Sequence, residues 1–494
     1  MTILDIITRD DPLSLAILAA DREPLTYAAL RETVVKAQQS LNAAGLGRKD
    51  KVAIVLPNGP DMAVAFVAIS AAAIAAPLNP AFREDEFRFY MQDLNVKALV
   101  VERDCASPAV DAAKSLRIPV IEFADFTLET PERGQTAFPG FASENEVALV
   151  LHTSGTTSRP KIVPLTQGNL VASAKNIART LRLSSADRCL NIMPLFHIHG
   201  LLAAVLATLG SGGSVFCTTG FNALKFFGQL EEARPTWYTA VPTMHQAILS
   251  RAERNASVIK ANPLRFIRSS SASLPVPVFN HLEQAFGCPV IEAYAMTENA
   301  HQMTSNQLPP AKRKAGTVGS AAGPEVRVMS PEGKLLGAGE EGEIVTRGPN
   351  VTLGYENNES ANATAFAHGW FHTGDQGIMD EDGYLKITGR LKEIINRGGE
   401  KVAPAEVDEA LLEHFAVHQA VVFAIPHDKL GEDVAAAVVL KEGMIATERD
   451  LQEFVNGKLA AFKVPRKIVF LDEIPKGATG KLQRIGLAQK LGLA

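Results

Sequence analysis

A run of small hydroxyl residues closed by a lysine carries the clearest chemical signal in the sequence. It reads Thr-Ser-Gly-Thr-Thr-Ser-Arg-Pro-Lys over residues 153–161 and lies between strand-like runs at 147–152 and 162–165. Hydroxyls and backbone amides around one glycine offer hydrogen-bond donors without bulk, and Lys161 adds a positive charge. The spacing of a Walker loop is absent. The segment therefore predicts a phosphate-binding loop of another type, with a solvated surface loop as the alternative.

A second glycine pattern fails when its sequence context is considered. Residues 337–342, Gly-Ala-Gly-Glu-Glu-Gly, match the dinucleotide-binding spacing G-x-G-x-x-G. The pattern opens into the strand-like run 343–347 instead of a helix, and its two acids would face the phosphates. We therefore expect an ordinary turn at these residues.

Alternating helices and strands must position the phosphate loop. Helical spacing of apolar residues runs over 27–44, and strand-like runs occupy 51–56, 96–101 and 118–123. The Ala-rich run 62–78 is short and weakly hydrophobic for a membrane span, so we interpret it as a buried helix. This order predicts an α/β fold in which helices cover a mostly parallel sheet.

The pattern changes after Gly316. Frequent glycines there separate short alternating runs such as 325–329 and 343–347, which is typical of an antiparallel sheet or a barrel. We therefore expect the sheet that follows the α/β part to be built from short antiparallel strands.

The segment after Gly389 shows a third pattern. A helix is expected from Pro404 to His414, because proline suits the first helical turn. Strand-like runs follow at 419–425 and 434–440, and a further helix begins near Thr447. These elements predict a small separate α+β unit.

The bulk composition excludes several classes of partner. The 494 residues carry a net charge of -5, so no basic excess favours nucleic acid or an anionic membrane. Four widely spaced cysteines argue against a zinc site or a disulfide framework. The first residues contain acids and lack the basic stretch of a secretory signal. We therefore expect a cytoplasmic protein with no membrane span and no obligate protein partner.

Five segments, taken in order, resemble the core motifs of the adenylate-forming superfamily, which comprises acyl-CoA synthetases, adenylation domains and luciferases. They are 153–161, 294–298 (YAMTE), 370–375 (WFHTGD), 389–393 (GRLKE) and 475–481 (PKGATGK). The resemblance implies a large N-terminal domain of two layered sheets with helices plus a distorted β-barrel, followed by a small mobile α+β lid. It places the domain that binds ATP and the acid at residues 1–390 and the lid at 391–494.

The same resemblance assigns roles to individual residues. Catalytic roles fall to Lys481, Thr297 and Glu298, and Glu298 would ligate Mg²⁺, a hard cation suited to a carboxylate. Contacts with ATP and AMP fall to Thr153, Ser154, Gly155, Thr156, Thr157, Lys161, Ala293, Tyr294, Asp375 and Arg390. Tyr294 would stack on adenine, whereas Asp375 and Arg390 would hold the ribose hydroxyls.

The resemblance also implies a second half-reaction with coenzyme A (CoA) as co-substrate. Lys392 matches the hinge at which the lid turns, and Lys481 matches the lysine that enters the site during adenylation. Gly398 and Gly399 resemble the glycine pair that lines the pantetheine tunnel, where a side chain would block the thiol. An ordinary turn is the alternative for this pair.

One position departs from the superfamily pattern. Many members have glycine directly after the loop lysine, where this chain has Ile162. Isoleucine is stiff and suits extended backbone. We therefore expect the following strand to begin one residue earlier and phosphate binding to persist.

Three segments usually shape the acyl pocket in the superfamily, and here they carry polar side chains. The segments are 194–200, 269–274 and 299–303. They offer His199, Ser271 and His301 as contacts for the acid. Burying an unpaired imidazole costs about 1–3 kcal/mol, which disfavours a fatty-acyl pocket and favours a short acid with a second carboxylate. The alternative is that one or two of these histidines are structural groups with satisfied hydrogen bonds.

The strings LVLHTSGTTSRPK, MPLFHIHGL, RFIRSSSASL and EAYAMTENAHQMTSN resemble those of oxalate–CoA ligases. This resemblance implies the conversion of oxalate, ATP and CoA into oxalyl-CoA, AMP and pyrophosphate through oxalyl-AMP. Two alternatives stay open: the same chemistry on malonate or a short- or medium-chain fatty acid, and a stand-alone adenylation module that loads a carrier protein. A binding protein with degenerate catalysis is disfavoured by the presence of Lys161, Glu298 and Lys481.

Overall fold

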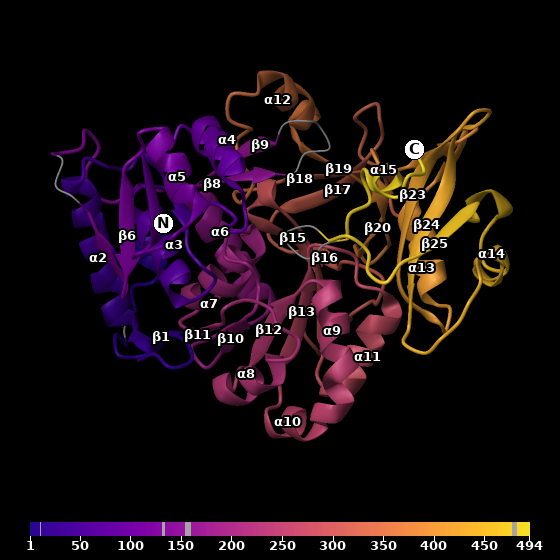
Figure 1. Ribbon diagram of the computed structural model, residues 1–494, viewed down its shortest axis with the longest axis horizontal. Helices are drawn as coiled ribbons and strands as arrows, with labels where there is room; N and C mark the ends of the chain where they lie inside the picture. The colour runs from indigo at the N-terminus through magenta and orange to yellow at the C-terminus, as the bar shows by residue number, and fades with distance from the viewer. Residues whose placement is uncertain (10, 131–133, 154–159, 477–481) are drawn as a thin grey trace.

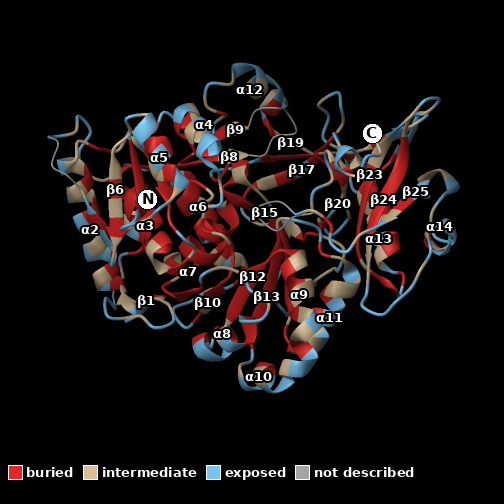
Figure 2. Cartoon of the chain, in the orientation of Figure 1, coloured by how far each residue is buried: buried red, intermediate tan, exposed pale blue. Residues whose placement is uncertain are grey.

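The computed structural model of the protein describes residues 1–9, 11–130, 134–153, 160–476 and 482–494 (Figure 1). Four sheets, each counted over these residues, form its framework. Figure 2 shows buried strands flanked by helices that turn one face to solvent. Central strands such as residues 51–55 and 74–77 are buried on both faces, which is why they carry the apolar runs that the sequence displays.

The first sheet has seven described strands in the order β7-β6-β5-β3-β4-β8-β9, and its central strands are parallel. Its strands are β3 (Lys51–Val55), β4 (Ile74–Pro77), β5 (Ala98–Glu102), β6 (Val120–Ala124), β7 (Thr127–Glu129), β8 (Val147–Thr153) and β9 (Lys161–Thr166). Strand β8 pairs antiparallel with β9, and Thr153 lies opposite Lys161. The predicted phosphate loop is therefore the connection between two paired strands.

The second sheet has nine described strands in the order β16-β15-β14-β13-β12-β10-β11-β1-β2. They are β1 (Leu15–Leu18), β2 (Leu25–Thr26), β10 (Arg188–Asn191), β11 (Ser214–Cys217), β12 (Trp237–Ala240), β13 (Phe266–Ser270), β14 (Val290–Met296), β15 (His301–Ser305) and β16 (Ser320–Ala321). Strands β10 to β14 are parallel, and β15 returns antiparallel beside β14. The carboxyl ends of β12, β13 and β14 therefore meet at one edge, where ligands bind in parallel α/β sheets.

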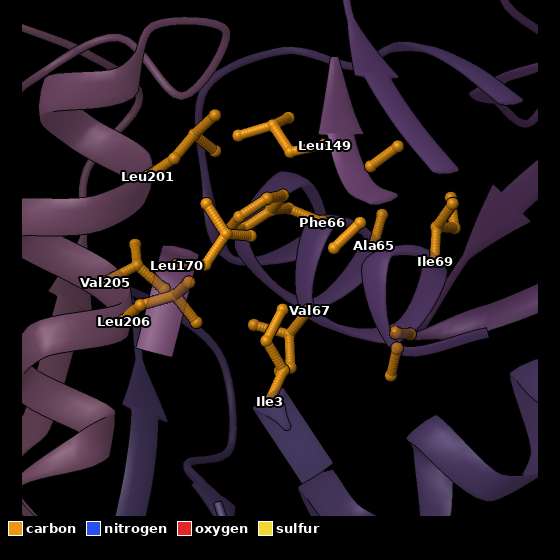
Figure 3. Packing of buried hydrophobic residues seen from close by; sticks show 14 of the residues in the cluster. Ile3, Ala65, Phe66, Val67, Ile69, Leu149, Leu170, Leu201, Val205 and Leu206 are labelled. Carbon is orange, nitrogen blue, oxygen red and sulfur yellow. The ribbon is translucent and has the colours of Figure 1, made fainter. Parts of the chain in front are cut away.

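Helix α3 (Pro60–Ala72) lies between elements of both sheets. Its residues from Met62 to Ala72 are all buried. Figure 3 shows Phe66 and Val67 of this helix packed among side chains from distant segments, including Ile3, Leu149, Leu170, Leu201, Val205 and Leu206. A helix that is apolar all round belongs inside a protein, so the prediction of a buried helix is confirmed. The predicted run is too long, however, because Ala73 is extended and residues 74–77 form β4.

Further helical elements of the large N-terminal part pack around and between these sheets. They are α1 (Ile3–Ile6), α2 (Tyr27–Ala43), α4 (Glu84–Leu94), α5 (Pro108–Ser115), α6 (Gln167–Thr180), η1 (His199–Leu206), α7 (Ala207–Gly210), α8 (Phe226–Ala233), α9 (Pro242–Ala252), η2 (Glu253–Asn255), α10 (Ala256–Ala261), α11 (Val276–Phe286), η3 (Thr297–Asn299), α12 (Glu359–Ala365) and η4 (Ala367–Gly369). Within the described ranges no helix combines the length and the apolar character needed to cross a bilayer.

The glycine-rich segment forms a third, antiparallel sheet. Its described strands follow the order β17 (Glu325–Met329), β18 (Glu341–Arg347), β19 (Phe371–Met379) and β20 (Leu385–Arg390). The expected distorted β-barrel does not close in the part of the chain that the structure describes, because four strands are too few to enclose a filled interior. Gly337 lies in the turn before β18, where its N–H donates to Glu340 Oε2 at 2.6 Å, so this glycine pattern is a turn as predicted.

The C-terminal elements form a fourth sheet, drawn in orange and yellow at the right of Figure 1. Its described strands are β21 (Ile395–Arg397), β22 (Glu400–Val402), β23 (Val417–His427), β24 (Gly431–Leu440) and β25 (Lys467–Phe470). Its helices are α13 (Pro404–Leu412), α14 (Glu448–Asn456), η5 (Ala461–Lys463) and α15 (Leu487–Lys490). Pro404 opens α13, and the Thr447 side chain caps α14, as the sequence predicted for both helix starts.

Candidate active site

A cavity of about 390 Å³ lies between the large N-terminal part and the C-terminal sheet. Ser271, Tyr294 and Asp375 line it from the N-terminal part, and Asp408 and Arg484 line it from the C-terminal part. The side chain of Arg484 bonds Asp408 at 2.7 Å and Glu393 at 3.1 Å, so it links the 391–394 turn with α13. The cavity therefore brings together residues that are far apart in the sequence.

One wall of the cavity carries a buried carboxylate held by two donors. Asp375 on β19 accepts a hydrogen bond from the Tyr294 hydroxyl at 2.5 Å and from Arg390 Nε at 2.7 Å. Burial alone would lower the pKa of Arg390, but the adjacent Asp375 carboxylate outweighs it and raises that pKa. Burial raises the pKa of the Tyr294 hydroxyl, which keeps it a donor. This arrangement fixes a hydrogen-bond acceptor at the cavity wall.

A second group forms around Glu298 in η3. The Tyr355 hydroxyl donates to Glu298 Oε1 at 2.9 Å, and Lys161 Nζ lies 4.3 Å from the centre of the Tyr355 ring. Burial raises the pKa of Glu298, although Tyr355 and the nearby Lys161 oppose the rise. Burial lowers the pKa of Lys161. A buried carboxylate beside a lysine suits a ligand that brings phosphate and a divalent cation together.

The donor set at Glu298 fits Mg²⁺ of the kind that nucleotides carry. Among the described residues no group of three or more His, Cys, Asp or Glu side chains could hold a metal ion alone. Mg²⁺ commonly takes one or two carboxylates and fills its remaining positions with phosphate oxygens and water. One buried carboxylate is therefore a sufficient protein contribution.

The three residues expected to contact the acid are brought together. His199 begins η1, a π-helix, and its Nδ1 lies 3.0 Å from Ser271 Oγ, while its Nε2 lies 2.6 Å from Thr239 Oγ1. The rings of His199 and His301 are 4.8 Å apart between centres. Both histidines are fully buried, and Ser271 lines the cavity.

Two of these residues adopt unusual backbone conformations. Ser271 has φ 75° and His301 has φ 98°, in a region that side-chain-bearing residues rarely occupy. Such conformations cost on the order of 1–3 kcal/mol each and gather at functional sites. At the end of β13 and at the start of β15, the contacts of these two side chains therefore compensate for the cost of an unfavourable backbone conformation.

Sequence reasoning missed Arg268, Thr239 and Gln302, which complete this polar group. Arg268 on β13 donates from Nη1 to His301 Nε2 at 3.3 Å and from Nη2 to Gln302 Oε1 at 3.4 Å. An arginine inside the otherwise uncharged strand segment Phe266–Ser270 was the available signal. We call His199, Thr239, Arg268, Ser271, His301 and Gln302 the polar cluster.

The other predicted positions are distributed as follows. Thr153 ends β8, Ala293 lines the cavity, and Thr297 begins η3 beside Glu298. Lys392 lies exposed in the turn after β20, close enough to lower the pKa of Lys161, for which burial is the main cause. Ser154, Gly155, Thr156, Thr157 and Lys481 lie outside the described residues.

Gly398 and Gly399 form the exposed turn between β21 and β22. Their φ angles are 61° and 99°, so the turn itself favours glycine at both positions. A Cβ on Gly398 would meet Leu430 at 2.8 Å, whereas a Cβ on Gly399 would meet nothing within 4 Å. The turn thus explains both glycines locally, while the space at Gly399 stays open.

The departure at Ile162 has a structural reason. Strand β9 begins at Lys161, so Ile162 already has extended backbone, as predicted. Its side chain is buried in a cluster with Val150 and Leu78, and its carbonyl accepts the N–H of Glu356 at 3.0 Å. Ile162 therefore packs into the core at the start of β9.

The layered sheets, with the buried carboxylates of Asp375 and Glu298, are typical of an enzyme that binds a nucleotide. Comparison with known families agrees. Residues 9–356 match the model of the AMP-binding enzyme family, and residues 406–481 match that of the AMP-binding enzyme C-terminal domain. The chain belongs to the AMP-binding enzyme family, and the expected superfamily is confirmed.

Individual relatives are similar over almost their whole length. The oxalate–CoA ligase of Arabidopsis thaliana is 43% identical over 99% of this chain and 97% of its own. The oxalate–CoA ligase of Saccharomyces cerevisiae is 43% identical over 90% of this chain and 87% of its own. The crystal structure of ATP-bound MatB from Rhodopseudomonas palustris, 29% identical, superposes with a TM-score of 0.88 and covers 99% of both chains.

Proposed function

We propose that the chain is an ATP-dependent oxalate–CoA ligase, which forms oxalyl-CoA, AMP and pyrophosphate through an oxalyl-AMP intermediate. The observation that carries the proposal is the buried polar cluster at the cavity. Its imidazoles and hydroxyl groups are hydrogen-bonded, but its guanidinium has no carboxylate partner among the described residues, and such a buried charge would be costly beside an acyl chain. A short acid with two carboxylates matches them. The names of the two curated relatives support oxalate.

In the first half-reaction one oxalate carboxylate oxygen attacks the α-phosphorus of ATP. The bond from that phosphorus to the bridging oxygen breaks, and pyrophosphate leaves. Lys161 and the loop residues Thr153 to Thr157 would hold the phosphates, and Lys481 would bridge the attacking carboxylate and the α-phosphate. Fixed positive charge at this point stabilises the growing negative charge of the transition state.

The nucleoside would rest on the wall formed by Tyr294 and Asp375. Tyr294 would stack on adenine, with Ala293 beside it, and Asp375 would accept hydrogen bonds from the ribose hydroxyls. Arg390 pairs with Asp375 and holds its side chain in place. Glu298, with Thr297 next to it, would hold Mg²⁺, which supplies charge neutralisation on the phosphates when bound.

In the second half-reaction the CoA sulfur attacks the oxalyl carbonyl carbon. The carbon–oxygen bond to AMP breaks, AMP leaves with the bonding electron pair, and the thiol proton passes to solvent or a nearby base. Residues 391–494 would act as a mobile lid on residues 1–390, turning at Lys392. Gly398 and Gly399 would then line the passage for pantetheine, which needs a path without side chains.

Pyrophosphate release across a panel of acids, each with and without CoA, tests the proposal. Oxalate should give the highest kcat/KM, and the full cycle should require CoA. A higher kcat/KM for malonate or for butyrate would transfer the proposal to that acid. Turnover that ignores CoA but loads a carrier protein would favour the adenylation-module alternative.

A further inference from the structure

Arg268 is a fully buried cation in an unusual environment. It is 0% exposed and ranks among the largest fully buried side chains of the molecule. Its hydrogen-bond partners are the neutral groups Thr239 Oγ1, His301 Nε2 and Gln302 Oε1, at 3.5, 3.3 and 3.4 Å. Its Nε has no partner within the described part of the chain. The three long hydrogen bonds and the Nε atom without a partner show that neutral groups hold this guanidinium only loosely.

Other arginines at the cavity are neutralised by carboxylates. Arg390 pairs with Asp375 at 2.7 Å, and Arg484 pairs with Asp408 at 2.7 Å. No described carboxylate lies within 4 Å of Arg268. Burial lowers the pKa of Arg268 to about 9, so the side chain is still a cation at neutral pH. An unpaired buried charge is strongly unfavourable, which makes a structural reason for this arginine hard to sustain.

The network around Arg268 leads to the cavity. Arg268 lies on β13, and the antiparallel strand β15 beyond β14 carries its partner His301. The His301 ring packs 4.8 Å from that of His199, which bonds Ser271 at the cavity surface. The charge is thus one or two side chains away from the place proposed for the acid.

The bond to His301 also fixes the state of that ring. A guanidinium can only donate, so His301 Nε2 must accept, and the ring proton must lie on Nδ1. Arg268 therefore orients His301 as a neutral donor through Nδ1. A protonated His301 would place a second cation against Arg268 and would break this bond.

We propose that Arg268 is the residue that selects acids with a second negative charge, acting through His301 and Ser271. This inference rests on the proposed function for the site and adds the group that reads the charge. Its guanidinium supplies the fixed positive field, and His301 and Ser271 supply the hydrogen bonds to the second carboxylate. Arg268 is a positioning residue, because it bonds to His301, which would touch the acid. The second carboxylate of the acid would balance the charge of Arg268.

Oxalate and oxamate give a matched pair of probes. They have nearly the same size and shape, but oxamate replaces the second carboxylate with a neutral amide. Wild type should strongly prefer oxalate in kcat/KM for pyrophosphate release. Arg268→Gln should shrink the ratio of oxalate to oxamate about 10- to 100-fold, the usual range for lost bonds to a charged group. The loss should fall on KM for oxalate more than on kcat.

Three comparisons separate charge selection from a structural role. Arg268→Lys keeps the charge and should retain most of the oxalate preference, even if overall activity falls. Arg265→Gln, next to the same strand, breaks the ion pair with Asp187 and should leave the ratio unchanged. Arg268→Gln without acid should unfold no more easily than wild type, since it removes an unpaired charge.

The outcomes that would overturn the inference are specific. An unchanged oxalate-to-oxamate ratio in Arg268→Gln would do so, as would an equal loss for oxalate, oxamate and butyrate. Loss of the preference in Arg268→Lys as complete as in Arg268→Gln would also do so. If wild type turns over malonate but no oxalate, the proposed function fails separately. Malonate against its monoamide then decides the role of Arg268 by the same criteria.

Discussion

At the scale of single residues, the molecule separates two kinds of buried charge. Asp375 has two donors, Tyr294 and Arg390, and forms an ion pair with Arg390. Arg268 has only neutral partners. Buried charges that pair with each other can form part of the cavity wall. A buried charge without a charged partner favours the binding of an ion of opposite sign. The first arrangement suits the ribose of a nucleotide, and the second suits the far carboxylate of a small acid.

His301 gives the direct test at this scale. Replacing His301 with Ala should lower kcat/KM for oxalate roughly 10- to 150-fold, because a hydrogen bond to a charged group contributes about 1.5–3 kcal/mol. Butyrate makes no such bond and should lose little. Steady-state pyrophosphate release with both acids measures the effect.

His245→Ala is a matched control for this variant. His245 is another fully buried histidine, bonded to the Tyr238 hydroxyl at 3.2 Å and near the backbone of Arg268, and it is not itself a member of the polar cluster. Its loss should affect both acids alike. Equal losses on oxalate and butyrate in His301→Ala would mean that His301 serves the fold or the nucleotide.

At the scale of elements, the ends of strands place the reactive groups. β13 ends beside Ser271, and η3 follows β14 directly and carries Glu298. The π-helix η1 widens the first turn after His199, a distortion that recurs at functional sites. The sheet fixes the position of a strand end, while the side chains just beyond it can face a ligand. Binding and catalytic residues are therefore common at strand ends.

The turn between β21 and β22 tests whether this part of the C-terminal sheet serves CoA. Gly399→Leu should block thioester formation, because a leucine side chain would fill the open space at this glycine. Acid-dependent pyrophosphate release in a single turnover should survive. The two half-reactions can be followed separately by pyrophosphate release and by CoA consumption.

Backbone strain must be separated from bulk in this test. Gly399 has φ 99°, so any side chain there strains the turn. Gly399→Ala introduces the same strain with a single methyl group and should keep most CoA turnover. Similar CoA consumption by the Leu and Ala variants would argue against a tunnel at Gly399.

At the scale of the whole molecule, buried titratable groups tie stability to pH. Glu292 on β14 is 2% exposed and accepts one hydrogen bond, from the Leu274 N–H at 2.8 Å. Its second oxygen has no partner among the described residues. Burial raises the pKa of Glu292 to about 8. The native state therefore holds a proton here that the unfolded chain releases near pH 4.5.

The sign of the resulting pH dependence follows from that difference. A carboxyl group with a raised native pKa stabilises the fold fully below pH 4.5 and loses this contribution as pH rises to about 8. Glutamine has the shape of the glutamate side chain but does not ionise. The thermal unfolding midpoint of Glu292→Gln should therefore fall less between pH 5 and pH 8 than that of wild type. Thermal unfolding of both proteins across this range measures it. Parallel curves for the two proteins would contradict the assignment.

Much of the fold could be predicted because periodicity and turn residues act locally. The strand at Lys51–Val55, the helix at Tyr27–Ala43 and the helix start at Pro404 all follow from the spacing of nearby residues. The ordered motifs indicated Glu298, Asp375 and Arg390 as candidate site residues, and the family match confirms the superfamily that the motifs indicated.

Only the tertiary structure decided which strands become neighbours. Arg268 lies on β13, Thr239 on β12 and Gln302 on β15. No pattern of neighbouring residues predicts that these strands lie close together in one sheet. The strand at Ile74–Pro77 was likewise decided by its pairing with β3 and with the more distant β8. The sequence determined the reactive side chains one by one. Their convergence depended on long-range strand order, and the low-dielectric interior that this order creates is the physical basis of the selectivity proposed for Arg268.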